Sequence, residues 1–130
     1  MINCDSNEFY MFWLGGFTEG EGSLSISIEK NKKAPYGIFL QPEFNVVQHK
    51  NGLNILNGFK TIFKNKGHIL SKSGSKNVLV NCLKGIKYLS EYIVPFYLKY
   101  LVDFSSKYYI NEFNKYLFIL NKLNERNLYG

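Results

Sequence analysis

Residues 13–28 read WLGGFTEGEGSLSISI, and two residue patterns meet in this stretch. Its first half is bulky and apolar, whereas from Ser23 onward polar and apolar residues alternate strictly. A period of two is typical of a half-buried strand, so the stretch predicts a helix followed closely by a strand. Glu19 and Glu21 stand at the junction, where the helix dipole disfavours acids by roughly 0.3–1 kcal/mol each. We therefore expect a further interaction to favour acids there.

The helix is expected over residues 9–17, after the capping sequence DSNE at residues 5–8. Its apolar residues lie on most faces of the helix, which indicates a helix buried on most sides. The pair Gly15–Gly16 costs about 1 kcal/mol per glycine relative to alanine, and this predicts close approach of another helix. Gly20 and Gly22 are expected to end the helix.

The remaining sequence predicts an α+β fold, in which helices cover one face of an antiparallel sheet. The residues 1–130 read as a single domain without internal repeats. Pro42 predicts a bulge or a locally unpaired position in its strand. The expected elements are strands at 23–29 and 37–48, a helix from 53 ended by Gly67, hairpin strands at 68–72 and 77–82, and two helices within 84–124, with Pro95 near the start of the second.

The chain is basic, with a net charge of +6 and a pI of about 9.2, which favours a nucleic-acid or anionic-surface partner. No apolar run is long enough to cross a membrane. We expect no import or secretion signal at the N-terminus. Cys4 and Cys82 are too few for a disulfide framework or a zinc site, and Cys82 is expected in a buried strand.

Phe, Tyr, Ile, Asn and Lys make up nearly half of the chain, and Ala34 is its one alanine. The codons of these five residue types are A/T-rich, so the composition favours an A/T-rich genome. An organelle that encodes the protein is the first expectation, with the mitochondrion ahead of the chloroplast. A bacterial or nuclear gene of similar composition is the alternative.

The motif WLGGFTEGEGS resembles the signature of LAGLIDADG homing endonucleases. The segments FNVVQHK and VPFYLKYLVDF are similar to that family's second strand and lysine-bearing helix start. The resemblance covers essentially the whole chain. It implies the αββαββα(α) fold of the family, in which an antiparallel sheet forms a saddle with helices packed behind it.

The resemblance also implies the roles of several residues. Glu21 matches the metal-binding acid, the Gly20 carbonyl matches the backbone metal ligand, and Glu19 matches the first motif acid. The implied cofactor is Mg²⁺ or another divalent cation, which prefers oxygen ligands. Gln48 matches the glutamine near the active centre. Tyr100 holds the position of the usual lysine, so Lys99 is a candidate only if the helix start shifts, since one residue rotates a helix face by ~100°.

A single motif copy implies a homodimer on double-stranded DNA, in which the motif helices of two copies pack side by side. We expect the dimer interface at Trp13, Gly15, Gly16 and Thr18. Polar side chains on outward strand positions and in loops are the nucleic-acid candidates. They are Ser25, Ser27, Glu29, Lys32, Lys33, Gln41, Asn45, Lys72, Lys76 and Asn77, with Asn81 on the same expected face and Phe39, Leu70 and Leu79 as apolar intrusions.

The leading hypothesis is therefore a site-specific, divalent-metal-dependent DNA endonuclease that acts as a homodimer. The alternative is an inactive protein of the same fold that binds structured RNA, as an intron maturase or as part of an organellar ribosome or ribonucleoprotein. Tyr100 at the usual lysine position and the apolar intrusions favour this alternative. A binding module unrelated to nucleic acids is the third possibility.

Overall fold

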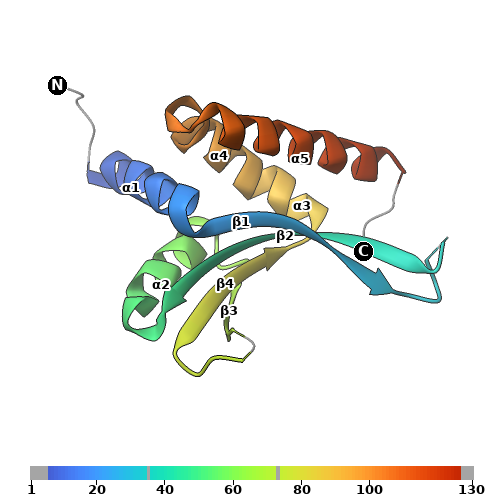
Figure 1. Ribbon diagram of the computed structural model, residues 1–130, viewed down its shortest axis with the longest axis horizontal. Helices are drawn as coiled ribbons and strands as arrows, with labels where there is room; N and C mark the ends of the chain where they lie inside the picture. Colours follow the sequence, from blue (N-terminus) through green and yellow to red (C-terminus); the bar gives the residue numbers. More distant parts are fainter. Residues whose placement is uncertain (1–5, 35, 73, 127–130) are drawn as a thin grey trace.

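The computed structural model describes residues 6–34, 36–72 and 74–126. A four-stranded antiparallel sheet is covered on one face by helices (Figure 1). The strand order is β1 (Gly22–Lys30), β2 (Ile38–His49), β4 (Val78–Lys84) and β3 (His68–Ser71). The helical layer consists of α1 (Ser6–Glu21), η1 (Lys50–Gly52), α2 (Leu53–Ile62), α3 (Ile86–Tyr88), η2 (Leu89–Ile93), α4 (Val94–Tyr100), η3 (Val102–Phe104) and α5 (Lys107–Arg126). The predicted α+β fold is confirmed.

The helix α1 runs to Glu21 and passes into β1 at Gly22 without a linker. The expectation that Gly20 ends the helix is therefore wrong, because Gly20 lies within its last turn. Gly22 does mark the junction, since a Cβ there would lie 2.7 Å from the carbonyl oxygen of Thr18. The Thr18 hydroxyl donates to the Leu14 carbonyl at 2.8 Å within the helix. Of the capping sequence, Asp5 lies outside the described residues.

The glycine Gly15 packs against the chain's own α4. A Cβ at Gly15 would lie 2.6 Å from the carbonyl oxygen of Tyr100, so only glycine fits this crossing. The helix that approaches Gly15 therefore belongs to the same chain. At Gly16, by contrast, a Cβ would meet no atom within 4 Å, and the residue is exposed.

The helix α2 ends at Ile62, five residues before the predicted Gly67. Lys64 adopts a left-handed conformation with φ 57°, and the amide of Asn65 donates to the Lys60 carbonyl at 2.8 Å. This is the hydrogen-bond pattern of a Schellman cap, which a lysine fills here in place of glycine. Gly67 serves a different purpose, because a Cβ there would lie 2.7 Å from the side-chain oxygen of Asn81.

One continuous helical segment runs through α3, η2 and α4, with a π-helical turn at η2. Pro95 follows this turn as the second residue of α4, which confirms the prediction that it lies near the start of a helix. A proline cannot donate to the residue four positions earlier, and its ring clashes with that carbonyl. The wider π turn accommodates both effects.

The core lies between the sheet and the helices and is rich in aromatic rings. Phe44 of β2 is fully buried and meets Phe59, Phe63 and Tyr97 from three directions. Tyr97 stacks in turn on Phe113 of α5, with 5.0 Å between the ring centroids. These contacts tie α2, α4 and α5 to the central strand. No described helix is long and apolar enough to cross a membrane.

Strand register decides which side chains face the helices and which face outward. The outward side, which we call the open face, carries none of the described helices (Figure 1). Pro42 pairs with Ile26 without a bulge, and its carbonyl accepts from Gly85 just past the end of β4. The predicted bulge or locally unpaired position is therefore wrong, because Pro42 stays in register and its missing N–H lies where β4 has already ended.

The predicted facing of β4 was wrong by one residue. Asn81 is opposite Val46 and Leu79 is opposite Gln48, so Asn81 and Leu79 point toward the helices. Asn81 is fully buried, and its amide has no hydrogen-bond partner within the described chain. Because the polar residue Asn81 lies on the core side, the alternation of polar and apolar residues in β4 indicated the opposite facing. Cys82 points to the open face, yet it is buried and free, and burial raises the pKa of its thiol.

Replacing Asn81 with leucine is expected to raise the free energy of unfolding by about 1–2 kcal/mol. A buried amide without a partner costs roughly 1–3 kcal/mol, and leucine has the same branched shape and number of heavy atoms without polar atoms. Chemical denaturation monitored by circular dichroism measures the change, with Asn57→Leu on the exposed face of α2 as control. A loss of stability in Asn81→Leu would contradict the account, because it would mean that the amide is satisfied.

Candidate active site and nucleic-acid interface

The acidic turn, Glu19–Gly20–Glu21, occupies the last helical residues before β1. All three residues are exposed, and no basic residue lies in this turn of α1. Two carboxylates and a free carbonyl at a helix C-terminus form a strongly negative, oxygen-rich group. Oxygen ligands and negative charge suit a hard divalent cation. The described residues contain no cluster of three or more His, Cys, Asp or Glu side chains that could hold a metal ion.

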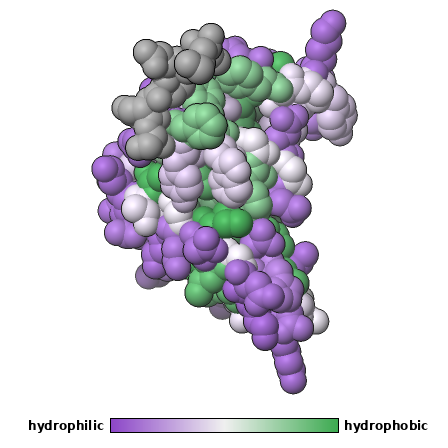
Figure 2. All heavy atoms as spheres, turned by 90° about the vertical axis from the view of Figure 1, so that its left-hand side faces the viewer, coloured by the Kyte–Doolittle hydropathy of each residue, from purple (hydrophilic) through white to green (hydrophobic). Residues whose placement is uncertain are grey.

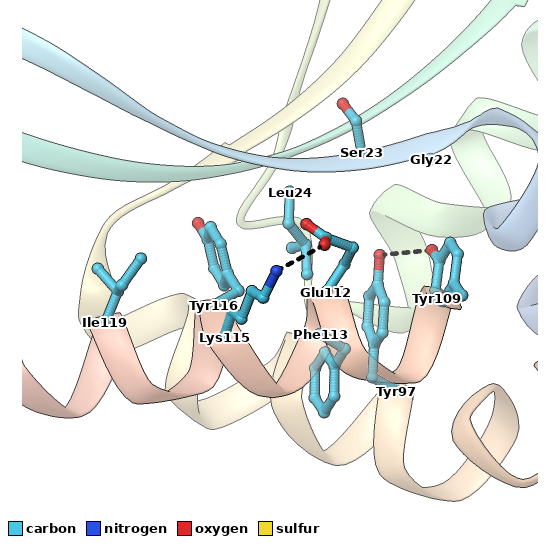
Figure 3. A pocket seen from close by; sticks show the side chains of 10 residues that line it. All are labelled: Gly22, Ser23, Leu24, Tyr97, Tyr109, Glu112, Phe113, Lys115, Tyr116 and Ile119. Carbon is cyan, nitrogen blue, oxygen red and sulfur yellow. Dashed lines mark hydrogen bonds and ion pairs between the residues drawn. The ribbon is translucent and has the colours of Figure 1, made fainter. Parts of the chain in front are cut away.

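A groove between β1 and α5 lies behind the acidic turn (Figure 3). It measures about 320 Å³, and the hydroxyls of Tyr97 and Tyr109 meet in it at 3.3 Å. Burial raises the pKa of Tyr109, and the charge of Glu19 adds to the rise. Glu19 is therefore within electrostatic reach of this tyrosine pair. The Tyr116 hydroxyl donates to the Ser25 carbonyl at 2.7 Å, so α5 also anchors the edge strand.

Gln48 lies on the helix side of β2, next to the α1–β1 junction. Val46 pairs with Gly22, the first residue of β1, and Gln48 lies two residues further along β2. Its side-chain oxygen accepts from the backbone N–H of His49 at 2.8 Å, and its side chain packs over Gly52. The structure thus brings Gln48 to the same end of α1 as the acids, while its role there stays a prediction.

Lys99 lies at the opposite end of α1. Its ammonium contacts the carboxylate of Glu8 at 3.2 Å and sits over the ring of Tyr100 at 5.2 Å. Contacts with Tyr100 and Glu8 raise its pKa, so it stays charged. Thirteen residues separate Glu8 from Glu21, about 20 Å at 1.5 Å per residue. The structure does not bring Lys99 to the acids, and we leave it out of the proposed centre.

The exposed side of α1 forms an apolar surface that nothing in the described chain covers. Phe9 is 70% exposed and Trp13 48%, and Phe104 joins them from η3 with 67%. With Phe12, Gly15, Gly16, Glu19, Tyr100 and Leu101 they line a groove of about 440 Å³. Figure 2 views this end of the molecule, where green and pale side chains gather in the upper half.

Two residues of the expected dimer interface do not fit this surface well. Thr18 is fully buried in the chain's own core, which contradicts its assignment. Gly15 lines the groove, yet its lack of a side chain serves the contact with α4. Trp13 and Gly16 are accessible. The sequence analysis missed Phe9 and Phe104, whose exposure no residue pattern indicated.

The open face carries five of the ten predicted nucleic-acid residues. By strand register, these are Ser25, Ser27, Glu29, Gln41 and Asn45. Phe39 and Leu70 also lie there, as expected, together with Val47 and Val80, which the sequence analysis missed. The loop candidates are exposed beyond the strand ends, and their contacts with nucleic acid stay predictions. They are Lys32, Lys33, Lys72, Lys76 and Asn77.

A family model described as LAGLIDADG endonuclease matches residues 14–117, which is most of the chain. The chain belongs to the LAGLIDADG endonuclease family. Over 85 residues it is 44% identical to DNA endonuclease I-CeuI of Chlamydomonas moewusii, a match that covers 65% of this chain and 38% of that protein. The predicted family and fold are thus confirmed.

Solved structures show the same family fold. The group I intron-encoded homing endonuclease I-CeuI, complexed with DNA, matches with a TM-score of 0.82 and 35% identity over 96% of this chain and 59% of that one. A double mutant of I-SmaMI matches with a TM-score of 0.76 and 25% identity over 90% of this chain and 38% of that one. The chain therefore spans less than two thirds of these relatives' length.

Proposed function

We propose that the protein is a site-specific, divalent-metal-dependent DNA endonuclease that acts as a homodimer. The observation that carries the proposal is the acidic turn at the α1–β1 junction, which places exposed oxygen ligands beside the start of an open sheet face. The major groove admits a two-stranded ribbon, and the antiparallel pair of β1 and β2 on that face is such a ribbon. The family membership and the DNA-complexed relative support this reading.

The metal would be held by the carboxylate of Glu21, the carbonyl of Gly20 and the carboxylate of Glu19. Mg²⁺ suits these ligands, because it binds proteins through one or two carboxylates and keeps further positions for water and phosphate oxygens. When bound, it would supply Lewis-acid activation of the scissile phosphate and of the attacking water. The chain's own contribution is to present both acids on a rigid helix end, with Gln48 alongside.

A second copy of this chain is the proposed occupant of the apolar surface of α1. The surface combines large exposed aromatic rings with Gly16, where a neighbouring helix can approach the backbone. A two-fold pair would bring two acidic turns together, one for each DNA strand. The lysines 32, 33, 72 and 76 at the two hairpin ends would contact phosphates on either side. The A/T-rich composition supports an organellar, first of all mitochondrial, gene.

A second candidate function is binding of structured RNA without cleavage. The observation that favours it is the position of Lys99 and Tyr100, which leaves the acidic turn without the expected lysine. The apolar residues Val47, Val80 and Leu70 on the open face also reduce its polar character.

Competitive selection separates the two functions. The full chain is incubated with a library of randomised DNA duplexes and with an equal library of structured RNA, in buffer without divalent metal. Retained molecules are then sequenced. We expect enrichment of a DNA duplex motif with two-fold symmetry, since a homodimer reads two half-sites. Enrichment of RNA with no DNA motif would overturn the proposed function in favour of the second candidate.

A further inference from the structure

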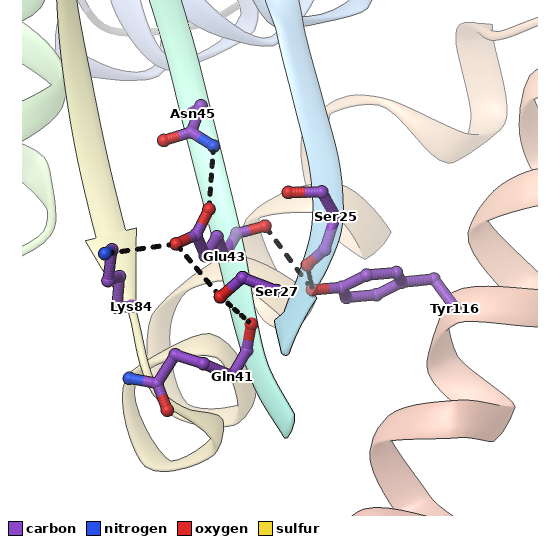
Figure 4. Close-up of polar contacts among 7 residues, drawn as sticks. All are labelled: Ser25, Ser27, Gln41, Glu43, Asn45, Lys84 and Tyr116. Carbon is purple, nitrogen blue, oxygen red and sulfur yellow. Dashed lines mark hydrogen bonds and ion pairs between the residues drawn. The ribbon is translucent and has the colours of Figure 1, made fainter. Parts of the chain in front are cut away.

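Four polar side chains from three strands meet on the open face, at the end of β4 (Figure 4). We call Ser27, Glu43, Asn45 and Lys84 the Glu43 cluster. The Lys84 ammonium lies 3.2 Å from Oε1 of Glu43. The Ser27 hydroxyl has one proton and lies near two acceptors, the Gln41 carbonyl at 3.3 Å and Oε1 of Glu43 at 3.5 Å. The Asn45 amide donates to Oε2 at 3.5 Å. Polar groups from β1, β2 and β4 thus surround the carboxylate.

The backbone beneath the cluster is fixed as well. Glu43 is directly opposite Ser25 on β1 and Lys84 on β4. The Tyr116 hydroxyl donates to the Ser25 carbonyl and lies 3.4 Å from the Glu43 carbonyl, which anchors the β1–β2 pair to α5. A side chain that is held on both sides and at its backbone loses little conformational entropy when it binds a ligand.

The cluster keeps both an acceptor and donors available. A carboxylate has about four lone-pair sites, and the three contacts leave one of them on Oε2. An ammonium has three N–H donors, of which the contact with Glu43 uses one. The exposed fractions are 16% for the Glu43 side chain and 48% for Lys84. The hydrogen bond with Glu43 raises the pKa of Lys84, so this lysine stays charged at neutral pH.

This acceptor–donor pair matches one base pair in the major groove. Cytosine presents the N4 amine as a donor, and its partner guanine presents O6 and N7 as acceptors. Carboxylates accept from cytosine N4, and lysine donates to guanine O6 and N7. An A·T pair offers lysine the single O4 acceptor of thymine beside a methyl group, which suits the ammonium less well.

Resting on the proposed DNA endonuclease function, we propose that Glu43 and Lys84 together read one C·G base pair in each half-site. Glu43 accepts from the cytosine amine, and Lys84 donates to the guanine. Ser25, opposite Glu43, is four residues from Glu21, about 13 Å at 3.3 Å per strand residue. At about 3.4 Å per base pair, the base pair that Glu43 and Lys84 contact lies within roughly five base pairs of the cleavage centre.

The test is a base-pair scan of the selected site. Duplexes that carry each of the four base pairs at each position are compared by relative binding and Mg²⁺-dependent cleavage. Wild type is expected to favour C·G about 10-fold to 100-fold at one position per half-site. Glu43→Gln should shift that position toward A·T, because glutamine pairs with adenine N6 and N7. Lys84→Met should lose the preference for guanine there.

The controls separate base reading from a structural role. Glu91→Gln removes the same charge from an exposed position of η2 in the helical layer, and it should leave the preference at this base pair unchanged. Thermal unfolding of each variant reports on folding. A uniform loss of binding across all sequences, or a wild type without a C·G preference in that region, overturns the inference while the endonuclease function stands. A wild type that binds no DNA overturns the proposed function and this inference with it.

Discussion

Replacing Glu21 with glutamine is expected to reduce DNA cleavage at least a hundredfold to a thousandfold, roughly the loss that follows removal of one preorganised electrostatic group. Glutamine keeps the shape of the side chain but removes the negative charge, so it is a poor ligand for Mg²⁺. Glu21 is exposed at the end of α1, so the change leaves the core untouched. Binding of the duplex is expected to stay within a few-fold of wild type.

Single-turnover cleavage of a selected duplex, with binding measured separately in metal-free buffer, gives both quantities. Glu125→Gln is the matched control, because Glu125 is an exposed glutamate on α5, well along the chain from the acidic turn. Full cleavage by Glu21→Gln would mean that the acidic turn does not hold the metal. An equal loss of binding and cleavage would mean that Glu21 acts in DNA binding and not in catalysis.

Replacing Gly16 with leucine is expected to weaken the homodimer at least a hundredfold and to abolish double-strand cleavage. A Cβ at Gly16 meets nothing within the chain, so the monomer accommodates the larger residue. In the proposed dimer, however, a second α1 helix approaches this backbone closely, and a leucine would hold it away. Sedimentation equilibrium measures the dissociation constant, and Asn57→Leu on the exposed face of α2 is the control.

The neighbouring glycine provides the opposite comparison. Gly15→Ala should destabilise the monomer itself by about 1–3 kcal/mol, the usual cost of overpacking, because its Cβ would lie 2.6 Å from the Tyr100 carbonyl oxygen. Substitutions at these two adjacent glycines are thus expected to have different effects. Gly15→Ala should impair folding, and Gly16→Leu should impair dimer assembly. A Gly16→Leu protein that remains a tight dimer would contradict the assignment of this surface.

The sequence predicted the acidic turn and the outward residues of β1 and β2 correctly, because both depend on local patterns. The alternation SLSISI has a period of two that only a strand satisfies. Gly15 shows where local reasoning stops, since a glycine pair predicts a close contact without saying whether the partner helix belongs to the same chain. Asn81 shows a second limit, because a buried polar residue reverses the facing read from alternation.

The directions in which Lys99 and Pro95 face depend on helix geometry, which residue spacing alone does not predict. The π turn at η2 lets Pro95 lie within a continuous segment, which changes the rotation of every residue after it. Lys99 therefore faces Glu8 at one end of α1 and not the acids at the other. The apolar groove involves Phe104 of η3, which lies far along the chain from Phe9 and Trp13, so only the fold brings these rings together.

The most direct test of the endonuclease function is to map the ends produced when the wild-type protein meets its selected duplex in Mg²⁺ and in EDTA. We predict cuts in both strands at positions related by a two-fold axis, in Mg²⁺ only, because two acidic turns act on one site. An intact duplex in Mg²⁺ despite tight, stoichiometric binding would contradict the account and would leave a binding protein built on this fold.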